Sequence, residues 1–423
     1  MTTKTNTKLY QLNKAMIGVV VALGLGTTMA SSVTQAADKV SLEEAEAIQR
    51  KLVTLDTHLD TPAHLVRPGF DIMERHTYGH DFSQVDVPRM QEGALDGGFW
   101  VLYTPQGPLT TEGYQQSRDT ALLRALAVRT MVTEHPETFA LALEPDDASE
   151  IKKAGKHIVY MSMENSYPLG TDMSLLETFY KFGLRMAGPV HFKNNQLGDS
   201  STDPEGVKWG GLSPLGETFV SEANRLGIVL DGSHAHDETV KDMIKLSKTP
   251  IILSHTGVKA IYDHPRNIDD DLLKQLAESG GVIQMNAYSD YLTALPENPE
   301  RKEAYKGLMA MVKQGADHKD LLEKRRDIEH EHPAVKASFD VYMKHFLHAL
   351  AVVGPKHVGI GADWDGGGGV DDMMDVVNLP MITQRLLEEG YTKEDLADIW
   401  SGNALRVLQQ AQDYAASLKT ASK

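Results

Sequence analysis

A repeating pattern of short apolar runs constrains the fold of this chain more than any other feature of its sequence. Each run ends at or near a polar or chemically reactive residue, and segments with helical periodicity lie between most of the runs. Alternation of strand-like and helix-like segments predicts a parallel sheet. The eight runs are 53–58, 99–103, 157–163, 184–191, 228–234, 251–255, 282–287 and 358–363.

Eight strand–helix units predict a single closed (β/α)8 barrel of the TIM type, in the α/β class. The active site of such a barrel lies at the C-terminal ends of its strands. The main alternative is an open, doubly wound sheet. Its nucleotide-binding fingerprints are missing, because the sequence has neither a Walker A motif nor a G-x-G-x-x-G segment that joins a strand to a helix.

The first 36 residues have the layout of a secretory signal peptide. Lysines precede an apolar run at 15–26, and small residues follow up to Ala36, after which we expect cleavage. The alternative is an uncleaved membrane anchor, but the run is shorter than the roughly 20 residues that span a bilayer. We therefore expect an exported domain at 37–423 without a stable membrane anchor, periplasmic in a Gram-negative source and otherwise secreted.

The composition narrows the chemistry. The chain has 423 residues with 17 histidines and no cysteine, which excludes disulfides, thiolate metal sites and a cysteine nucleophile. Its net charge of −17 becomes −20 when the three lysines of the signal segment are removed, and this acidity argues against nucleic acid as the main partner. Any metal site must therefore consist of histidines and carboxylates.

A charge-rich segment at about 291–335 separates the seventh and eighth runs. Its composition predicts helices, with prolines at 296, 299 and 333 as breaks. It could serve as a lid or an oligomer contact, or it could be a solvated helical excursion.

Candidate metal ligands lie at the ends of several predicted strands. His58 and Asp60 form an H-x-D pair, and residues i and i+2 of a strand point to the same side. One such pair is a weak signal, but residues that end different strands of a barrel meet at one mouth. The other strand-end candidates are Glu164, His191, His234, His255 and Asp363.

These donors predict a catalytic zinc or a similar divalent ion. Their number favours two ions, with His58 and Asp60 at one, His234 and His255 at the other, and Glu164 as the bridge. Two ions roughly 3.5–4 Å apart share a water, lower its pKa and polarise a carbonyl, which suits hydrolysis.

Other polar residues near these runs are expected to be structural. His236 follows His234 by two positions and is interpreted as a loop residue. Asp365 is expected to turn the loop after Asp363. The His330-Glu331-His332 segment lacks the second histidine of H-E-x-x-H and lies in the charged insertion.

Short motifs with a fixed order run through nearly the whole mature chain. They are Val-Asp-Val-Pro-Arg at 85–89, Gly-Leu-Ser at 211–213, Asn-Arg-Leu-Gly at 224–227, Asp-Gly-Ser-His at 231–234, Ser-Lys at 247–248, Ser-His at 254–255, His-Pro-Arg-Asn at 264–267, His-Val-Gly-Ile-Gly-Ala-Asp at 357–363 and Gly-Asn-Ala-Leu-Arg at 402–406. This ordered set resembles the membrane dipeptidase (renal dipeptidase) family of zinc peptidases, and the signal segment suggests an exported bacterial member. The resemblance implies a metal-dependent barrel with two zinc ions per chain and, in this family, a homodimer.

The resemblance also implies roles for individual residues. The metal ligands would be His58, Asp60, Glu164, His234 and His255, with Glu164 bridging. Asp363 matches the residue that passes a proton to the leaving amine, and His191 matches the group that stabilises the oxyanion. Arg266 matches the residue that holds the terminal carboxylate, a task that suits its planar fork, and Tyr291 falls at a substrate-binding position. A structural salt bridge is the alternative for Arg266.

The implied activity is hydrolysis of dipeptides with a free C-terminal carboxylate, by a hydroxide bridging two zinc ions. The chain departs from the usual family pattern at Leu59, Ala63 and Asn165-Ser166, so the floor of the pocket differs and the preferred substrate stays open. A related barrel amidohydrolase acting on N-acyl amino acids or lactams is the first alternative. An exported peptide-binding protein without catalysis is the second.

Overall fold

The structure is a computed structural model that describes residues 40–421. The predicted signal segment, 1–36, lies outside the described residues. Export, with the periplasmic or secreted location that would follow from it, therefore stays a prediction. Within the described part of the chain, no helix is both long and apolar enough to cross a membrane.

Eight parallel strands form the barrel that the sequence predicts. One sheet has the order β1-β2-β4-β5-β6 and another the order β7-β8-β9. Single parallel bridges join the two sheets at both sides, between Asp231 and Ile252 and between Leu59 and Trp364, so the strands close into a ring. The strands are β1 (Leu55–Leu59), β2 (Gly97–Val101), β4 (His157–Met163), β5 (Leu184–Ala187), β6 (Val229–Leu230), β7 (Ile252–Thr256), β8 (Val282–Met285) and β9 (Val358–Ile360).

Two details differ from the predicted strands. A short extra strand, β3 (Phe139–Leu141), pairs with the first residues of β4 and was not predicted. Several runs were predicted too long: β8 and β9 end early, at Met285 and Ile360, and the largest differences are at β5, which ends at Ala187, and β6, which ends at Leu230. Pro189 has no N–H for a ladder, and His234 has a left-handed backbone with φ of 64°, so neither segment can continue as a strand.

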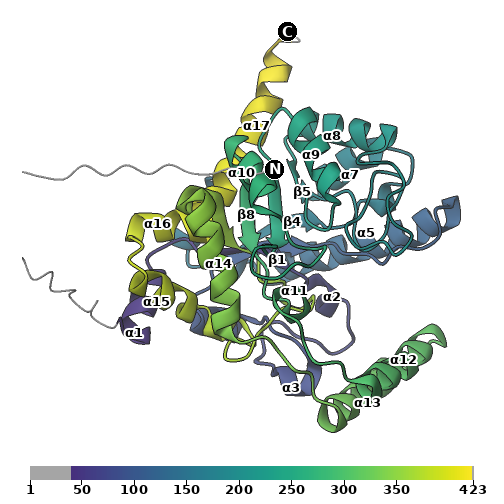
Figure 1. The fold of residues 1–423 in the computed structure, drawn as a ribbon, viewed down its shortest axis with the longest axis vertical. Helices are drawn as coiled ribbons and strands as arrows, with labels where there is room; N and C mark the ends of the chain where they lie inside the picture. Colours follow the sequence, from purple (N-terminus) through teal and green to yellow (C-terminus); the bar gives the residue numbers. More distant parts are fainter. Residues whose placement is uncertain (1–39, 422–423) are drawn as a thin grey trace, which may run out of the picture. The chain divides into compact units, whose positions relative to one another are not determined.

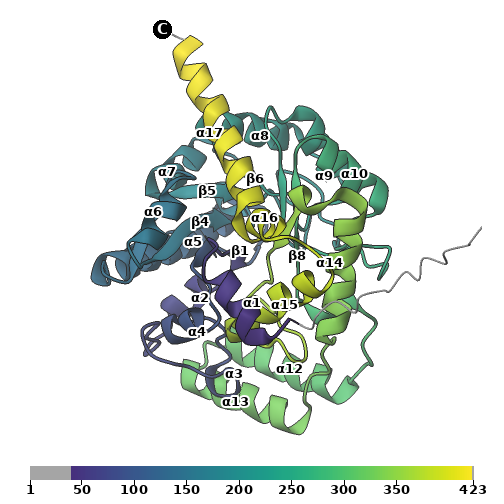
Figure 2. The same ribbon diagram turned by 90° about the vertical axis from the view of Figure 1, so that its left-hand side faces the viewer.

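Helices surround the barrel, as Figures 1 and 2 show. Cap residues explain several of their ends. Ser213 accepts a hydrogen bond from Gly216 N at the start of α8, and Gly227 ends α8 in the left-handed region. The longer helices are α5 (Thr111–Glu134), α7 (Ser174–Phe182), α8 (Pro214–Leu226), α9 (Asp237–Leu246), α10 (Asp270–Glu278), α14 (Phe339–Val353), α15 (Pro380–Glu388) and α17 (Asn403–Ala421). The shorter ones are α1 (Leu42–Gln49), α2 (Pro62–Leu65), α3 (Tyr78–Asp81), α4 (Val87–Glu92), α6 (Asp147–Lys153), α11 (Ser289–Leu292) and α16 (Lys393–Ala397).

The C-terminal helix α17 closes the N-terminal end of the barrel. Its apolar face packs in one buried cluster with residues from the first positions of the strands, among them Leu55, Val229, Ile252 and Val282. This packing fills the bottom of the barrel with side chains and leaves the C-terminal ends of the strands as the place for a site.

The charge-rich segment contains two long helices, α12 (Pro299–Lys313) and α13 (His318–Glu331). They lie side by side in both ribbon views and extend away from the barrel near α3 (Figures 1 and 2). Arg301 of α12 pairs with Glu329 of α13 at 2.7 Å. Arg325 of α13 lies 3.9 Å from the centre of the Phe82 ring, just after α3, which ties the pair of helices to the main body.

Candidate active site

Seven of the predicted site residues meet at the C-terminal mouth of the barrel. His58 and His255 lie within β1 and β7, and Asp60 and Glu164 directly follow β1 and β4. The other three lie in loops, with His191 after β5, His234 after β6 and Asp363 after β9. Six of the seven residues are buried, and the His191 side chain is 12% exposed.

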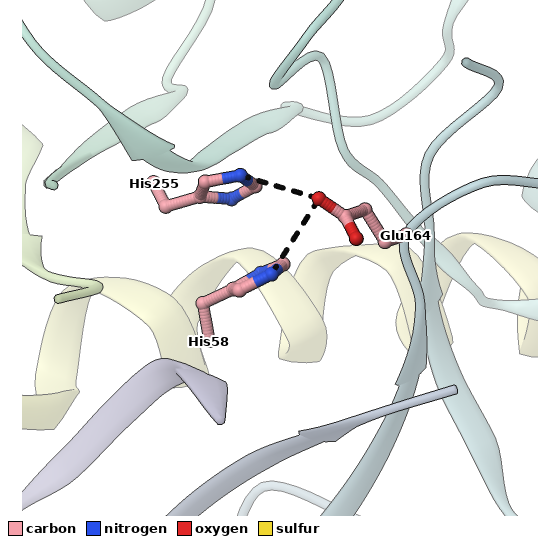
Figure 3. A group of neighbouring side chains, drawn as sticks. All are labelled: His58, Glu164 and His255. Atoms are coloured by element: carbon pink, nitrogen blue, oxygen red, sulfur yellow. Dashed lines mark ion pairs between the residues drawn. The ribbon is translucent and has the colours of Figure 1, made fainter. Parts of the chain in front are cut away.

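One oxygen of Glu164 is the centre of this cluster. Glu164 Oε1 lies 2.8 Å from His234 Nε2, 3.4 Å from His255 Nε2, 3.5 Å from His191 Nε2 and 3.7 Å from His58 Nε2. Figure 3 shows the carboxylate beside the rings of His58 and His255, both of which direct a nitrogen toward it. The predicted bridging residue therefore sits where histidines from four different strand ends converge.

Donor atoms of these side chains also form groups small enough to hold metal ions. Within each group, all the donor atoms lie within 4.8 Å of one another. The groups are His58 with Glu164 and His255, Glu164 with His191 and His234, and His58 with Asp60 and Asp363. The structure thus brings the five predicted ligands together and adds His191 and Asp363 to their immediate surroundings.

Hydrogen bonding in the cluster fits metal ligands. Among the described residues, His58 Nε2 and Asp60 Oδ1 are buried without a hydrogen-bond partner, a costly state for a polar atom. His234 Nε2 and His255 Nε2 lie 2.9 Å apart. Each neutral imidazole carries one N–H, so the two nitrogens can face each other with a shared hydrogen or with their lone pairs directed at one ion. Nitrogen and carboxylate donors aimed at common points, with no sulfur, suit zinc or a similar divalent ion.

Burial shifts the titration of most members of the cluster toward their neutral forms. It raises the pKa of Glu164 well above its usual value and that of Asp363 to about 7. It lowers the pKa of three histidines, which also lie near Arg266 and other cationic groups: His191, His234 and His255. Neutral imidazoles are the form that binds a metal ion.

His58 is the exception. Burial disfavours its charged form, but the nearby carboxylates of Asp60, at 3.5 Å, Glu164 and Asp363 outweigh burial and raise its pKa to about 10. The three carboxylates around His58 therefore favour a positive charge at this place, and a bound divalent cation would supply it.

The loop after β9 is built to bring two carboxylates close together. A Cβ at Gly366 would lie 2.1 Å from Asp60 Oδ2 and 2.2 Å from Asp363 Oδ1, so only glycine permits this approach. Asp363 and Asp365 both have left-handed backbones with φ of 65°. Asp365 is anchored by the Thr61 hydroxyl at 2.7 Å and by Gln84 N at 2.6 Å, which agrees with its predicted role in shaping the loop.

Arg266 and Tyr291 lie beside the cluster. Arg266 is 3% exposed, donates from Nη2 to His255 O at 3.0 Å, and has its guanidinium 5.1 Å from the centre of the Tyr291 ring. Within residues 40–421 no carboxylate lies within 4 Å of this guanidinium, so the salt bridge considered as its alternative role is not formed there. His236, expected to be a loop residue, caps α9 through Glu238 N.

Sequence reasoning assigned no role to two further neighbours of the cluster. The Tyr103 ring lies 4.8 Å from the His191 ring, and Arg124 of α5 donates to the Tyr103 carbonyl oxygen. Burial lowers the pKa of Arg124, while the nearby charges of Asp60 and Glu164 favour its charged form. Tyr103 ends a predicted strand and could have been found by position, whereas Arg124 lies within a helix whose sequence carries no motif.

The chain was compared with known proteins. The sequence profile of the membrane dipeptidase family (peptidase family M19) matches residues 42–422. An uncharacterized dipeptidase of Schizosaccharomyces pombe is 28% identical over 377 residues, which cover 86% of this chain and 82% of that protein. Dipeptidase aclJ of Aspergillus oryzae is 29% identical over 347 residues, covering 80% and 73%.

Two solved structures with the same fold are a probable dipeptidase and a metallopeptidase. The probable dipeptidase PvdM from Pseudomonas aeruginosa superposes with a TM-score of 0.75 at 26% identity, covering 88% of this chain and 98% of its own. A metallopeptidase from Rhodobacter sphaeroides, solved with a phosphinate mimic of L-Ala-D-Ala, has the same fold, with a TM-score of 0.67 at 23% identity and coverages of 85% and 99%. The fold and the family that the sequence predicts are confirmed: this chain is a metallopeptidase and belongs to the membrane dipeptidase family.

Proposed function

We propose that the protein hydrolyses dipeptides that carry a free C-terminal carboxylate, with two zinc ions held around Glu164. The observation that carries the proposal is the position of Glu164 Oε1, which faces histidine nitrogens from four strand ends at 2.8 to 3.7 Å. One carboxylate so placed can serve two ions at once.

In this proposal the five ligands serve two ions that share Glu164. His58 and Asp60 would hold one ion, and His234 and His255 would hold the other. When bound, such a pair of ions lowers the pKa of a shared water and polarises the scissile carbonyl. The barrel residues around it supply what remains of the chemistry, namely proton transfer, charge stabilisation and the choice of substrate.

Asp363 is suited to move a proton. It is buried beside His58 and Asp60, and burial raises its pKa to about 7, so near neutral pH it can both accept a proton and release one. In the proposed reaction it takes the proton of the attacking water and delivers it to the departing amine nitrogen.

His191 is suited to stabilise the developing oxyanion. Its pKa is lowered by burial and by Arg266, so it is neutral near pH 7 and has one N–H to donate. Its Nε2 lies 3.5 Å from Glu164 Oε1, which places the ring at the edge of the proposed metal site. A fixed donor at this position favours the tetrahedral transition state over the planar substrate.

Arg266 is suited to select the substrate. It is a buried cation without a carboxylate partner among the described residues, next to the tyrosine at the mouth of the site. A free C-terminal carboxylate can take both arms of a guanidinium. An N-acyl amino acid carries its carboxylate at the same distance from the scissile amide as a dipeptide does, so Arg266 alone does not separate these substrates; the dipeptide differs by its free N-terminal amine.

A substrate panel tests the proposal. The zinc-loaded protein is expected to hydrolyse dipeptides and to leave tripeptides and N-acyl amino acids intact, and a chelator is expected to stop the reaction. Asp363→Asn is the matched variant, since it should retain both metal ions and lose turnover. Cleavage of N-acyl amino acids but not dipeptides would favour the amidohydrolase alternative, and zinc binding without any hydrolysis would favour the peptide-binding one.

A further inference from the structure

The barrel has two seams where its ladder of hydrogen bonds is reduced to a single bridge. One lies between β6 and β7, and the other between β9 and β1. The proposed metal ligands flank these seams, with His234 and His255 at the first and His58 at the second. A buried aspartate that is not in any of the candidate metal-binding groups lies at each seam: Asp231 is 2% exposed and Asp56 is 0% exposed.

The two aspartates bond in the same way. Asp231 Oδ1 accepts from Ser233 N, two residues ahead, and from Ser254 N across the seam, both at 2.9 Å. Asp56 Oδ1 accepts from His58 N, two residues ahead, at 2.8 Å, and Asp56 Oδ2 accepts from Ala362 N across the seam at 3.0 Å. Each carboxylate therefore replaces the missing ladder and fixes the two strand ends that carry site residues.

At the first seam the connection reaches a metal ligand through a side chain. Ser254 Oγ donates to Asp231 Oδ2 at 2.6 Å and lies 2.9 Å from His255 Nδ1. A hydroxyl has one hydrogen, so Ser254 must accept from His255. The proton of His255 is then on Nδ1, and the lone pair of Nε2 faces Glu164.

We infer that Asp231 and Asp56 are positioning residues for the metal site, Asp231 through Ser254 and the tautomer of His255, and Asp56 through the backbones of His58 and Ala362. The inference rests on the proposed metal site. It assigns to the seams a role in metal binding in addition to their role in closing the barrel.

Asp231→Asn is the sharpest perturbation. The amide oxygen must stay against the two backbone N–H groups, so the amide nitrogen takes the place of Oδ2 and donates to Ser254. Ser254 then turns its own hydrogen toward His255 Nδ1, which moves the ring proton to Nε2, where a metal ion must bind. Ser254→Ala removes the hydroxyl without forcing this change of tautomer, so its effect is expected to be smaller.

The experiment measures zinc affinity by competition with a chromophoric chelator, together with the visible spectrum of the cobalt-substituted protein. Asp231→Asn is expected to weaken zinc binding by about 10- to 100-fold and to alter the cobalt spectrum. The double variant Asp231→Asn/Ser254→Ala is expected to bind zinc more tightly than Asp231→Asn alone, because the forced tautomer needs the hydroxyl.

Asp96→Asn is the matched control. Asp96 accepts from Thr54 N at 2.8 Å at the opposite end of β1, so its loss perturbs the barrel without reaching a ligand. The inference is overturned if Asp231→Asn keeps the wild-type affinity and spectrum, if Asp96→Asn weakens zinc binding equally, or if the double variant is weaker than both singles. If Asp231→Asn does not fold, the zinc affinity of Ser254→Ala is compared with that of Asp96→Asn, and equal affinities would overturn the inference. Wild-type protein that binds zinc but cleaves no dipeptide would contradict the proposed function and leave this inference standing.

Discussion

Replacing Arg266 by methionine should separate recognition of the substrate carboxylate from the rest of catalysis. The guanidinium has five N–H donors, of which Nη2 supplies one to His255 O, and Nε has no partner among the described residues. Enough donors therefore remain for a carboxylate to bind through two hydrogen bonds. Methionine keeps an unbranched chain of similar length and removes the charge.

The size of the effect follows from the burial of Arg266. Removing one partner of a buried, hydrogen-bonded charge pair costs about 2–5 kcal/mol, which corresponds to a loss of roughly 30- to 5,000-fold in kcat/KM. The loss should apply to dipeptides with a free carboxylate. A dipeptide whose C-terminus is an amide lacks the charge and should change by less than about threefold.

Steady-state kinetics on each dipeptide and its C-terminal amide provide the assay, with Arg266→Lys as a second variant. Lysine keeps the charge but not the planar fork of arginine. The kcat/KM of Arg266→Lys should therefore lie between those of the wild type and of Arg266→Met. Equal losses for the acid and the amide would refute the reasoning. They would show that Arg266 acts by holding the backbone of His255.

Three further perturbations follow from the geometry of the cluster. Glu164→Gln should lower the bound zinc from two ions to one or none and weaken the remaining binding by at least about 100-fold, as measured by elemental analysis after dialysis. Gly366→Ala should displace the Asp60 and Asp363 carboxylates and reduce both zinc affinity and kcat; an unchanged zinc affinity would contradict the close approach in the structure. In chelator-treated protein, ionised Asp363 destabilises the fold because its pKa is raised from 3.8 to about 7, so Asp363→Asn should gain stability relative to wild type as the pH rises from about 4 to about 7 in urea unfolding. A difference in stability that does not vary with pH would show that Asp363 is not buried as described.

Strand ends could be read from the sequence because they combine a local pattern with a rule of topology. His58 and His255 end short β-branched runs, and a parallel barrel brings such ends together whatever the loops do. His191 and His234 were also expected at the mouth, but as parts of strands. Both lie in loops, and the left-handed backbone of His234 has no signature in its sequence.

Other features depend on packing between distant parts of the chain. β3 is three residues long, too short for an alternating pattern to predict it. Arg124 reaches the Tyr103 carbonyl oxygen from the middle of a long helix. The bond from Asp231 to Ser254 joins two motifs that the sequence does contain, but its existence and direction follow only from atomic positions.

The most direct test of the account is a titration of the metal-free protein with zinc while the rate of dipeptide hydrolysis is followed. If Glu164 joins two catalytic ions, the rate should rise to a plateau at two equivalents of zinc per chain. A plateau at one equivalent would contradict the shared site, and no hydrolysis at any zinc content would contradict the proposed activity.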